Sequence, residues 1–97
     1  MLVMVFMCAI TAIAATKAEA DALYEKENYA EAAKVYLMVT KANGVSYEVY
    51  YNLGNCYYNL DDIPQAVLYY ERAYLLNPGD ADVRANLALA RGKTVDK

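Results

Sequence analysis

The sequence predicts an all-α protein built from repeated pairs of helices. Three observations support this prediction: an internal similarity at an offset of about 34 residues, apolar side chains at helical spacing within each copy, and helix start and stop signals that recur at the same offset. The expected helices cover residues 16–27, 29–42, 46–59, 63–76 and 80–92. A chain of 97 residues has room for one such domain.

The internal similarity defines the units. At the offset of about 34 residues, the aligned pairs include Tyr24 with Tyr58, Ala32 with Ala66, Tyr36 with Tyr70, Asn43 with Asn77, and Ala20 with Gly54. A third copy begins, because Asn86-Leu87-Ala88 follows the pattern of Asn52-Leu53-Gly54. We therefore expect one unit over residues 16–46, a second over 47–80, and a last helix within 81–97. That helix either caps the array or starts a third unit.

Local signals agree with two helices in each unit. Asp62 can cap the N-terminus of a helix, with Pro64 in its first turn and the Gln65 side chain reaching back. Asn28 and Glu31 are expected to form the corresponding cap one unit earlier. Stop signals follow at Asn43-Gly44 and at Asn77-Pro78-Gly79. Gly54 and Ala66 are small where the paired helices must approach each other closely.

Composition excludes several classes of function. The net charge of −3 argues against nucleic-acid binding, which needs a basic surface. The chain has no histidine and two cysteines, Cys8 and Cys56, which match no metal-binding spacing and no disulfide framework. We expect Cys56 to be a small buried residue. The 11 tyrosines can form a surface that is hydrated and still binds a partner.

The first fifteen residues form a separate segment. Residues 1–15 carry no charge, and the apolar run has the length of a signal-peptide core and is short for a membrane span. Ala12-Ile13-Ala14 supplies a small-x-small cleavage pattern, although no Lys or Arg precedes the apolar run. A cleaved signal, an uncleaved membrane anchor and an apolar helix packed on the repeats are the three interpretations. An exported, periplasmic or inner-membrane location is expected, with the cytoplasm as the alternative.

With these residues in view, the chain resembles tetratricopeptide repeat proteins. The segment from Tyr50-Tyr51-Asn52-Leu53-Gly54-Asn55 to Asn77-Pro78 is close to the consensus of that family and covers residues 47–80. Residues 13–46 are a weaker copy, because Thr16 and Glu19 stand where the family usually has large apolar residues. The resemblance implies an α-solenoid fragment whose concave groove binds a protein or peptide.

A narrower resemblance is also present. The run from Tyr69-Tyr70-Glu71-Arg72-Ala73 to Ala85-Asn86-Leu87-Ala88 is similar to the exported repeat proteins of the bacterial aerotolerance operon, the BatE type. This resemblance implies a role at the cell envelope, with membrane helices and sometimes an SH3-like module after the repeats.

The family's groove positions can be projected onto this sequence. They are Lys17, Asp21, Tyr24 and Glu25 in the first unit, Tyr51, Asn52, Asn55, Tyr58 and Asn59 in the second, and Asn86 and Leu89 in the last helix. Tyrosine rings and asparagine amides suit an extended peptide, because the amides both donate and accept hydrogen bonds. Alternatively these residues only solvate the surface, and Asn52 bonds between adjacent units. The family's carboxylate clamp is disfavoured, since Asp21 stands where it needs an asparagine.

Face assignments follow from helical spacing. Tyr51, Asn55 and Tyr58 lie on one helix face, where we expect the tyrosines to be exposed to solvent in the absence of a partner. Tyr57 and Tyr70 are expected in the core. Val83, Leu87 and Ala90 should cover the second unit, which leaves Ala88 and Leu89 less protected and would favour self-association.

No enzymatic activity is expected. Gly92-Lys93-Thr94 resembles the end of a phosphate-binding loop, but Leu87 occupies the position of its required glycine. Without histidine or a glycine fingerprint, neither acid–base nor nucleotide chemistry has its usual residues. The expected function is protein or peptide binding in the groove, without cofactor or metal. The alternative is a structural, self-associating module that positions a membrane segment.

The N-terminal segment yields the first prediction. In the native cell, residues up to about Ala14 are removed by a signal peptidase or are held in a membrane, because their length and apolarity suit either fate. Mass spectrometry of the mature N-terminus, on soluble and membrane fractions, distinguishes the two. A full-length protein that begins at Met1 and is found in the soluble cytosolic fraction would contradict both outcomes.

Overall fold

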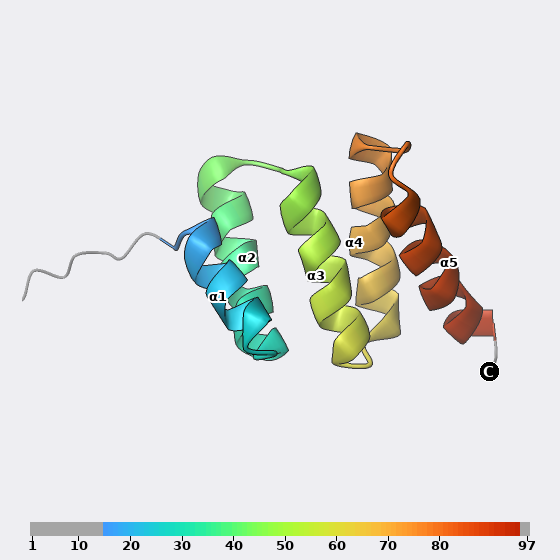
Figure 1. The fold of residues 1–97 in the computed structure, drawn as a ribbon, viewed down its shortest axis with the longest axis horizontal. Helices are drawn as coiled ribbons and strands as arrows, with labels where there is room; N and C mark the ends of the chain where they lie inside the picture. The colour runs from blue at the N-terminus through green and yellow to red at the C-terminus, as the bar shows by residue number, and fades with distance from the viewer. Residues whose placement is uncertain (1–14, 96–97) are drawn as a thin grey trace, which may run out of the picture.

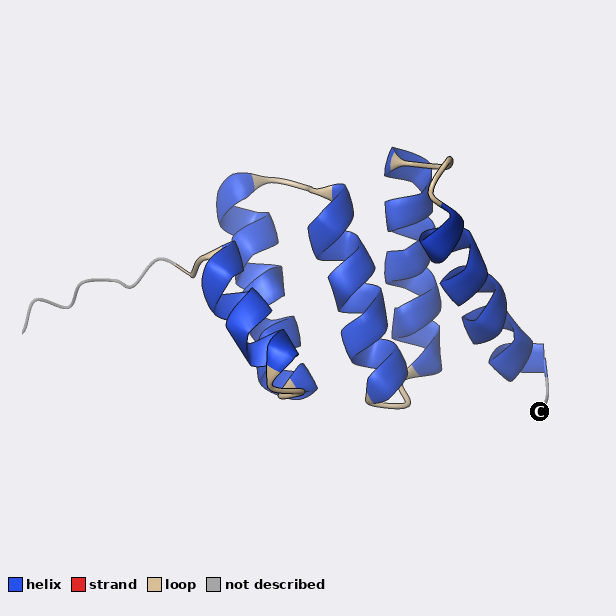
Figure 2. Ribbon diagram, viewed as in Figure 1, coloured by secondary structure: helices blue, strands red, loops and turns tan. Residues whose placement is uncertain are grey.

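The computed structural model describes residues 15–95, and these residues form five α-helices and no strand (Figures 1 and 2). The helices are α1 (Lys17–Glu25), α2 (Tyr29–Asn43), α3 (Tyr47–Asn59), α4 (Ile63–Leu76) and α5 (Ala81–Val95). The all-α prediction is confirmed. Every predicted boundary lies within three residues of the observed one, and the largest difference is at α5, which continues to Val95.

The helices stand side by side in chain order. Each helix packs against the next, so that α1 pairs with α2, α3 with α4, and α5 lies against α4 at the far side (Figure 1). Because the connections are short, neighbouring helices run in opposite directions. The result is a single layer of helix pairs in which α1, α3 and α5 occupy corresponding positions.

The turns within the two helix pairs have the same geometry. Glu27 and Asp61 both adopt positive φ angles, of 62° and 63°. In each turn the following amide, of Asn28 or Asp62, donates to the carbonyl of Leu23 or Tyr57 at 2.9 Å. This is a Schellman-type helix end, usually made by glycine. Its occurrence at non-glycine residues explains why α1 ends two residues before the predicted boundary.

The helix caps differ in part from those predicted. Asn28 stands at the N-cap of α2, but its side chain makes no capping hydrogen bond. Asp62 caps α4 by accepting from the Gln65 amide at 3.4 Å, whereas no return bond from the Gln65 side chain is present. A complete capping box occurs instead on α1, where Thr16 and Glu19 bond each other's backbone amides. The polar side chains at positions 16 and 19 are therefore explained by their role in capping the start of α1.

Most of the buried side chains belong to two clusters. The first lies between α1, α2 and α3, and the second between α4 and α5; the buried members are Ala20, Ala32, Ala33, Tyr36, Val39, Val49, Leu53 and Cys56 in the first and Ala66, Tyr70, Leu87 and Ala90 in the second. Cys56 is fully buried, as predicted, and burial raises the pKa of its thiol to about 12. A thiol of that kind is unreactive at neutral pH.

The N-terminal segment lies mostly outside the described residues. The predicted signal or anchor, Cys8 and the proposed cleavage site after Ala14 all fall within residues 1–14. Ala15 is partly buried and packs against the first core cluster. Among residues 15–95, no helix is both long enough and apolar enough to cross a membrane.

Gly54 marks the closest approach of two helices. A Cβ atom at this position would lie 2.3 Å from Cδ1 and 2.5 Å from Cε1 of the buried Tyr70 ring. Real atoms do not approach this closely, so the α3–α4 packing depends on the absence of a side chain. The prediction that Gly54 is small because the paired helices meet there agrees with this geometry.

The second prediction concerns this contact. Gly54→Ala should lower the free energy of unfolding by about 1–3 kcal/mol, because the new methyl group forces the Tyr70 ring out of place. Gly92→Ala is the matched control, since Gly92 lies in α5 with open space around its Cβ position. It should raise stability by roughly 0.5–1 kcal/mol through helix propensity. Urea unfolding followed by circular dichroism measures both, and a stabilised Gly54→Ala variant would refute the packing argument.

Candidate functional site

The candidate site is a pocket to which the first helices of the units contribute. It has a volume of about 330 Å³ and is lined by Tyr24 of α1, Asn55, Tyr58 and Asn59 of α3, Tyr70 of α4, and Asn86 and Leu89 of α5. Six of these seven residues belong to the predicted groove set. The lining carries no charged side chain, so the pocket offers hydroxyl and amide groups beside an apolar edge at Leu89.

Hydrogen bonds hold the centre of the pocket in place. Asn55 Oδ1 accepts from the Tyr70 hydroxyl and, at 3.1 Å, from Asn86 Nδ2. Asn86 Nδ2 also lies 3.1 Å from the Tyr51 hydroxyl oxygen. The network therefore joins α3, α4 and α5. Because its members satisfy one another, Asn55 and Asn86 have fixed orientations at the pocket.

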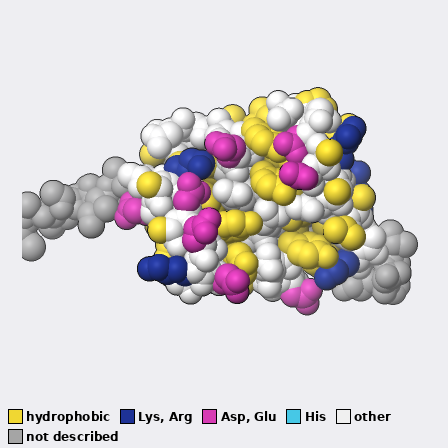
Figure 3. Space-filling view, viewed as in Figure 1, with side chains coloured by type: hydrophobic (Ala, Val, Ile, Leu, Met, Phe, Trp, Pro, Cys, Tyr) yellow, Lys and Arg dark blue, Asp and Glu magenta, His cyan; other side chains and the backbone are white. Residues whose placement is uncertain are grey.

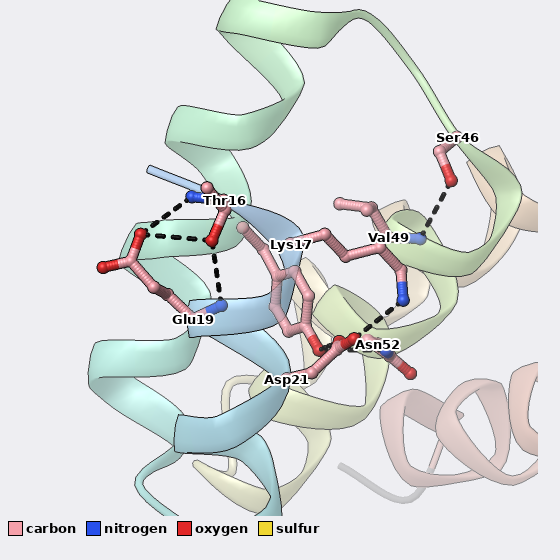
Figure 4. Close-up of polar contacts among 8 residues, drawn as sticks. Thr16, Lys17, Glu19, Asp21, Ser46, Val49 and Asn52 are labelled. Carbon is pink, nitrogen blue, oxygen red and sulfur yellow. Dashed lines mark hydrogen bonds and ion pairs between the residues drawn. The ribbon is translucent and has the colours of Figure 1, made fainter. Parts of the chain in front are cut away.

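The first unit contains the corresponding network one repeat earlier. Tyr36 donates to Asp21 Oδ1 at 2.5 Å, and Asn52 Nδ2 donates to the Tyr36 hydroxyl oxygen at 3.0 Å. Figure 4 shows Asp21 and Asn52 meeting between α1 and α3. The interpretation of Asn52 as a bond between adjacent units agrees with this contact. Lys17 adds an ion pair to Asp21 at 2.8 Å. None of the projected groove residues Lys17, Asp21 and Asn52 lines the pocket.

The Asp21 carboxylate is the main charged group of this network. Burial disfavours its ionised form, but the hydrogen bonds from Lys17 and Tyr36 outweigh burial and hold the pKa of Asp21 below its usual range. Burial, together with the hydrogen bond to Asp21, raises the pKa of the Tyr36 hydroxyl. Asp21 is therefore ionised and Tyr36 neutral at physiological pH. The negative charge is compensated within the protein by Lys17.

Two tyrosines predicted to be exposed to solvent, Tyr51 and Tyr58, are partly buried. Tyr51 stacks on Tyr47 with a centroid distance of 6.2 Å and lies at the same distance from the ring of Tyr70. Tyr58 packs against the second core cluster, and the Lys93 ammonium lies 4.5 Å above its ring. The prediction of exposed rings was wrong because neighbouring rings and α5 cover them. Truncating either tyrosine would therefore disturb the fold as well as the site.

The two tyrosines assigned to the core differ. Tyr70 is 1% exposed, as predicted, whereas Tyr57 is only partly buried. Tyr57 lies at the border of both clusters, with its ring stacked on Tyr69 at 5.7 Å. Glu25 stands apart from all of these contacts, because it is exposed at the last residue of α1 and does not line the pocket.

Sequence reasoning missed the role of two hydroxyl groups. The alignment identified Tyr36 and Tyr70 as repeated helix positions, but their hydroxyls reach Asp21 and Asn55 and position the site. A signal was present in the residue type. A tyrosine repeated at a buried position requires a hydrogen-bond partner that phenylalanine would not need.

The site offers little for catalysis or metal binding. Within residues 15–95, no group of three or more Cys, Asp or Glu side chains is placed to hold a metal ion. The pocket lining consists of neutral amides, hydroxyls and one leucine. What this arrangement can do chemically is form hydrogen bonds and apolar contacts with a bound molecule.

The third prediction follows from the charge of Asp21. Because its folded pKa is depressed, the ionised form stabilises the fold above the unfolded pKa of about 4, and this stability is lost as pH falls through the folded pKa. Asp21→Asn introduces the residue type that the second unit has at the equivalent position, Asn55. It should remove the part of the folding stability that is lost at acidic pH. More than a third of the side chain is exposed, so the loss at neutral pH should be only about 0.5 kcal/mol. Thermal unfolding between pH 2 and pH 7 tests this, and parallel pH profiles for both proteins would contradict it.

Comparison with known proteins assigns the fold to a family. Residues 17–81, which include α1 to α4 and the first residue of α5, match the family model described as tetratricopeptide repeat. No curated protein matches the chain. Tetratricopeptide repeats generally act as protein–protein interaction modules and are typically non-catalytic scaffolds. The five antiparallel helices, the repeated turn geometry and the matched segment together show that this chain belongs to the tetratricopeptide repeat family.

Proposed function

We propose that the pocket is the part of a concave groove in which this protein binds an extended peptide segment of a partner. The observation that supports this most directly is the convergence of α1, α3 and α5 on one uncharged pocket. Its volume of about 330 Å³ is at the small end of ligand pockets, which span about 300–1,000 Å³. A site of this size suits one or two residues of a longer peptide.

The chemistry of the lining favours a peptide backbone with an apolar side chain. Asn55 is oriented by its bonds to Tyr70 and Asn86, and the Asn59 amino group donates to the Asn55 backbone carbonyl at 2.8 Å. The Asn59 carbonyl oxygen and the Tyr58 hydroxyl are then placed to pair with peptide amides and carbonyls. Leu89 is 59% exposed and offers an apolar surface beside them. A highly charged ligand would find no counter-charge in the lining.

The proposed setting is a cell-envelope complex. The apolar residues 1–15 and the resemblance to the exported repeat proteins of the aerotolerance operon support this location. In that setting the repeats would recruit a partner to the membrane surface. The mature N-terminus, measured by mass spectrometry, distinguishes an exported or anchored protein from a cytoplasmic one.

The fourth prediction tests the groove with a matched pair of variants. Random peptides are displayed and selected on the folded chain, and the dissociation constants of the selected peptides are measured by calorimetry. Leu89→Asp should weaken binding about tenfold or more, because it places a charge at the apolar edge of the pocket. Leu89 and Val45 are equally exposed, at 59% and 60%, but Val45 lies in the loop between α2 and α3.

Val45→Asp is therefore the control for a general effect of an added charge. It should leave peptide binding within about twofold, and both variants should melt like the parent, since each side chain is more than half exposed. Equal binding by the Leu89→Asp and Val45→Asp variants would place the ligand elsewhere. Failure to select any peptide would favour the structural, self-associating module instead.

A further inference from the structure

A separate hollow is formed by α2, α3 and α4. It has a volume of about 280 Å³ and is lined by Leu37, Thr40 and Lys41 of α2, Tyr50 of α3, and Tyr69 and Arg72 of α4. None of these residues lines the pocket described above. The lining contains two cationic side chains, Lys41 and Arg72, and no carboxylate. We call this site the basic hollow.

Each of the three helices around the basic hollow has a single acidic residue. On α2 this residue is Glu31, whose carboxylate pairs with Lys34 at 3.4 Å. On α4 it is Glu71, whose carboxylate pairs with Arg91 of α5 at 2.6 Å. The carboxylates of α2 and α4 therefore pair with cations outside the hollow lining.

The acidic residue of α3, Glu48, acts on α1. The pKa of Lys17 is raised by its hydrogen bond to Asp21 and, to a smaller extent, by the charge of Glu48. Within residues 15–95, neither Lys41 nor Arg72 takes part in an ion pair. The positive charges of the basic hollow are therefore not neutralised by a carboxylate of the described part of the chain.

Two tyrosine rings hold the Arg72 guanidinium in place. Its Cζ atom lies 5.1 Å from the centroid of the Tyr69 ring and 5.9 Å from that of the Tyr50 ring, and the two centroids are 5.7 Å apart. Stacking of this kind uses the face of the guanidinium group and leaves the N–H groups at its edge able to donate. A carboxylate matches that edge with two parallel hydrogen bonds. Because Arg72 is already positioned, pairing costs less side-chain entropy than with a freely moving arginine.

An exposed apolar side chain lies one helical turn from each cation. Met38 is 52% exposed and precedes Lys41 by three residues, and Leu75 is 76% exposed and follows Arg72 by three. At the repeat offset of about 34 residues, Met38 aligns with Arg72 and Lys41 with Leu75. The same two positions of α2 and α4 therefore supply one cation and one apolar side chain each. Such a surface suits an acidic side chain that has apolar neighbours.

We propose that the basic hollow binds a segment of a partner protein that places an Asp or Glu side chain between Lys41 and Arg72 and apolar side chains over Met38 and Leu75. An anionic membrane is disfavoured, because basic segments that bind membranes use about four to eight Lys or Arg residues and the hollow has two. The net charge of −3 also opposes an anionic membrane. A free anion would leave Met38 and Leu75 uncovered.

The fifth prediction uses two peptides that differ in one charge. They are N-acetyl-Leu-Ser-Glu-Ser-Leu-amide and the same peptide with Gln in place of Glu, in which alternate side chains share one face when the peptide is extended. Nuclear magnetic resonance titration of the intact chain measures both affinities. The Gln peptide should bind about fivefold more weakly, because hydrogen bonds to a charged group are stronger than neutral ones. The Arg72 Nε–H and Lys41 amide signals should shift with the Glu peptide.

Variants of the protein test the position of the site. Lys41→Gln and Arg72→Gln should each weaken binding of the Glu peptide about fivefold, to the affinity of the Gln peptide. Lys41 is exposed, so Lys41→Gln should melt like the parent even if Arg72→Gln loses stability with its ring contacts. Lys26→Gln is the matched control, because Lys26 is an exposed lysine outside the hollow lining. It should leave the affinity within about twofold.

The groove and the basic hollow can be told apart in the same titration. Leu89→Asp should not change the affinity for the Glu peptide, and the Asn55 and Asn59 signals should stay constant. Absence of a Glu-dependent shift at Lys41 and Arg72, or equal effects of Lys41→Gln and Lys26→Gln, would overturn the proposal.

Two other occupants give their own contrary results. Binding to vesicles of phosphatidylserine and phosphatidylcholine that is lost in the Arg72→Gln variant would assign the basic hollow to a membrane. Dimers in analytical ultracentrifugation that dissociate on Lys41→Gln but not on Lys26→Gln would assign it to a second copy of the chain.

Discussion

Two buried tyrosine hydroxyls determine how the helix pairs join. Tyr36 and Tyr70 are 0% and 1% exposed, and a buried hydroxyl without a partner costs about 1–3 kcal/mol. Each hydroxyl donates to the first helix of its own unit, at Asp21 or Asn55. An asparagine from the next unit then joins the same network. The bonds that satisfy the buried groups therefore also orient successive units and fix the polar side of the pocket.

The same network shows what the sequence could and could not predict. Helix number, order and most boundaries follow from local periodicity and caps, which recur at a fixed offset. Membership of the pocket follows from register, and three of the projected groove positions, Tyr24, Asn55 and Asn86, lie in its lining. The exposure of Tyr51 and Tyr57 was assigned incorrectly, because a long side chain at the border of a core is covered or uncovered by its neighbours. Which side chains form hydrogen bonds between helices depends on the distances between those helices. The spacing of residues along the sequence does not give these distances.

The two units have the same framework but different electrostatics. In the first unit, Lys17 and Asp21 form an ion pair at the network, whereas the second unit has Tyr51 and Asn55 at the same positions. Acidic side chains gather toward the α1 end of the visible face, and hydrophobic side chains gather over α3 to α5 (Figure 3). In the first unit, Lys17 already pairs with the Asp21 carboxylate. The uncharged network of the second unit instead lies beside amide and hydroxyl groups that can form hydrogen bonds with a ligand.

The helix α5 contributes to the pocket through one of its sides. Asn86 and Leu89 line the pocket, whereas Ala88 and Arg91 line a separate hollow. Between them, Leu87 and Ala90 are buried against α4 and fix the position of the helix. Because residues on opposite sides of one helix do not share contacts, substitutions at Ala88 or Arg91 should leave binding in the pocket nearly unchanged. The buried residues Leu87 and Ala90 hold Asn86 and Leu89 at the pocket, so a substitution in the buried row would disturb the site as well as the packing.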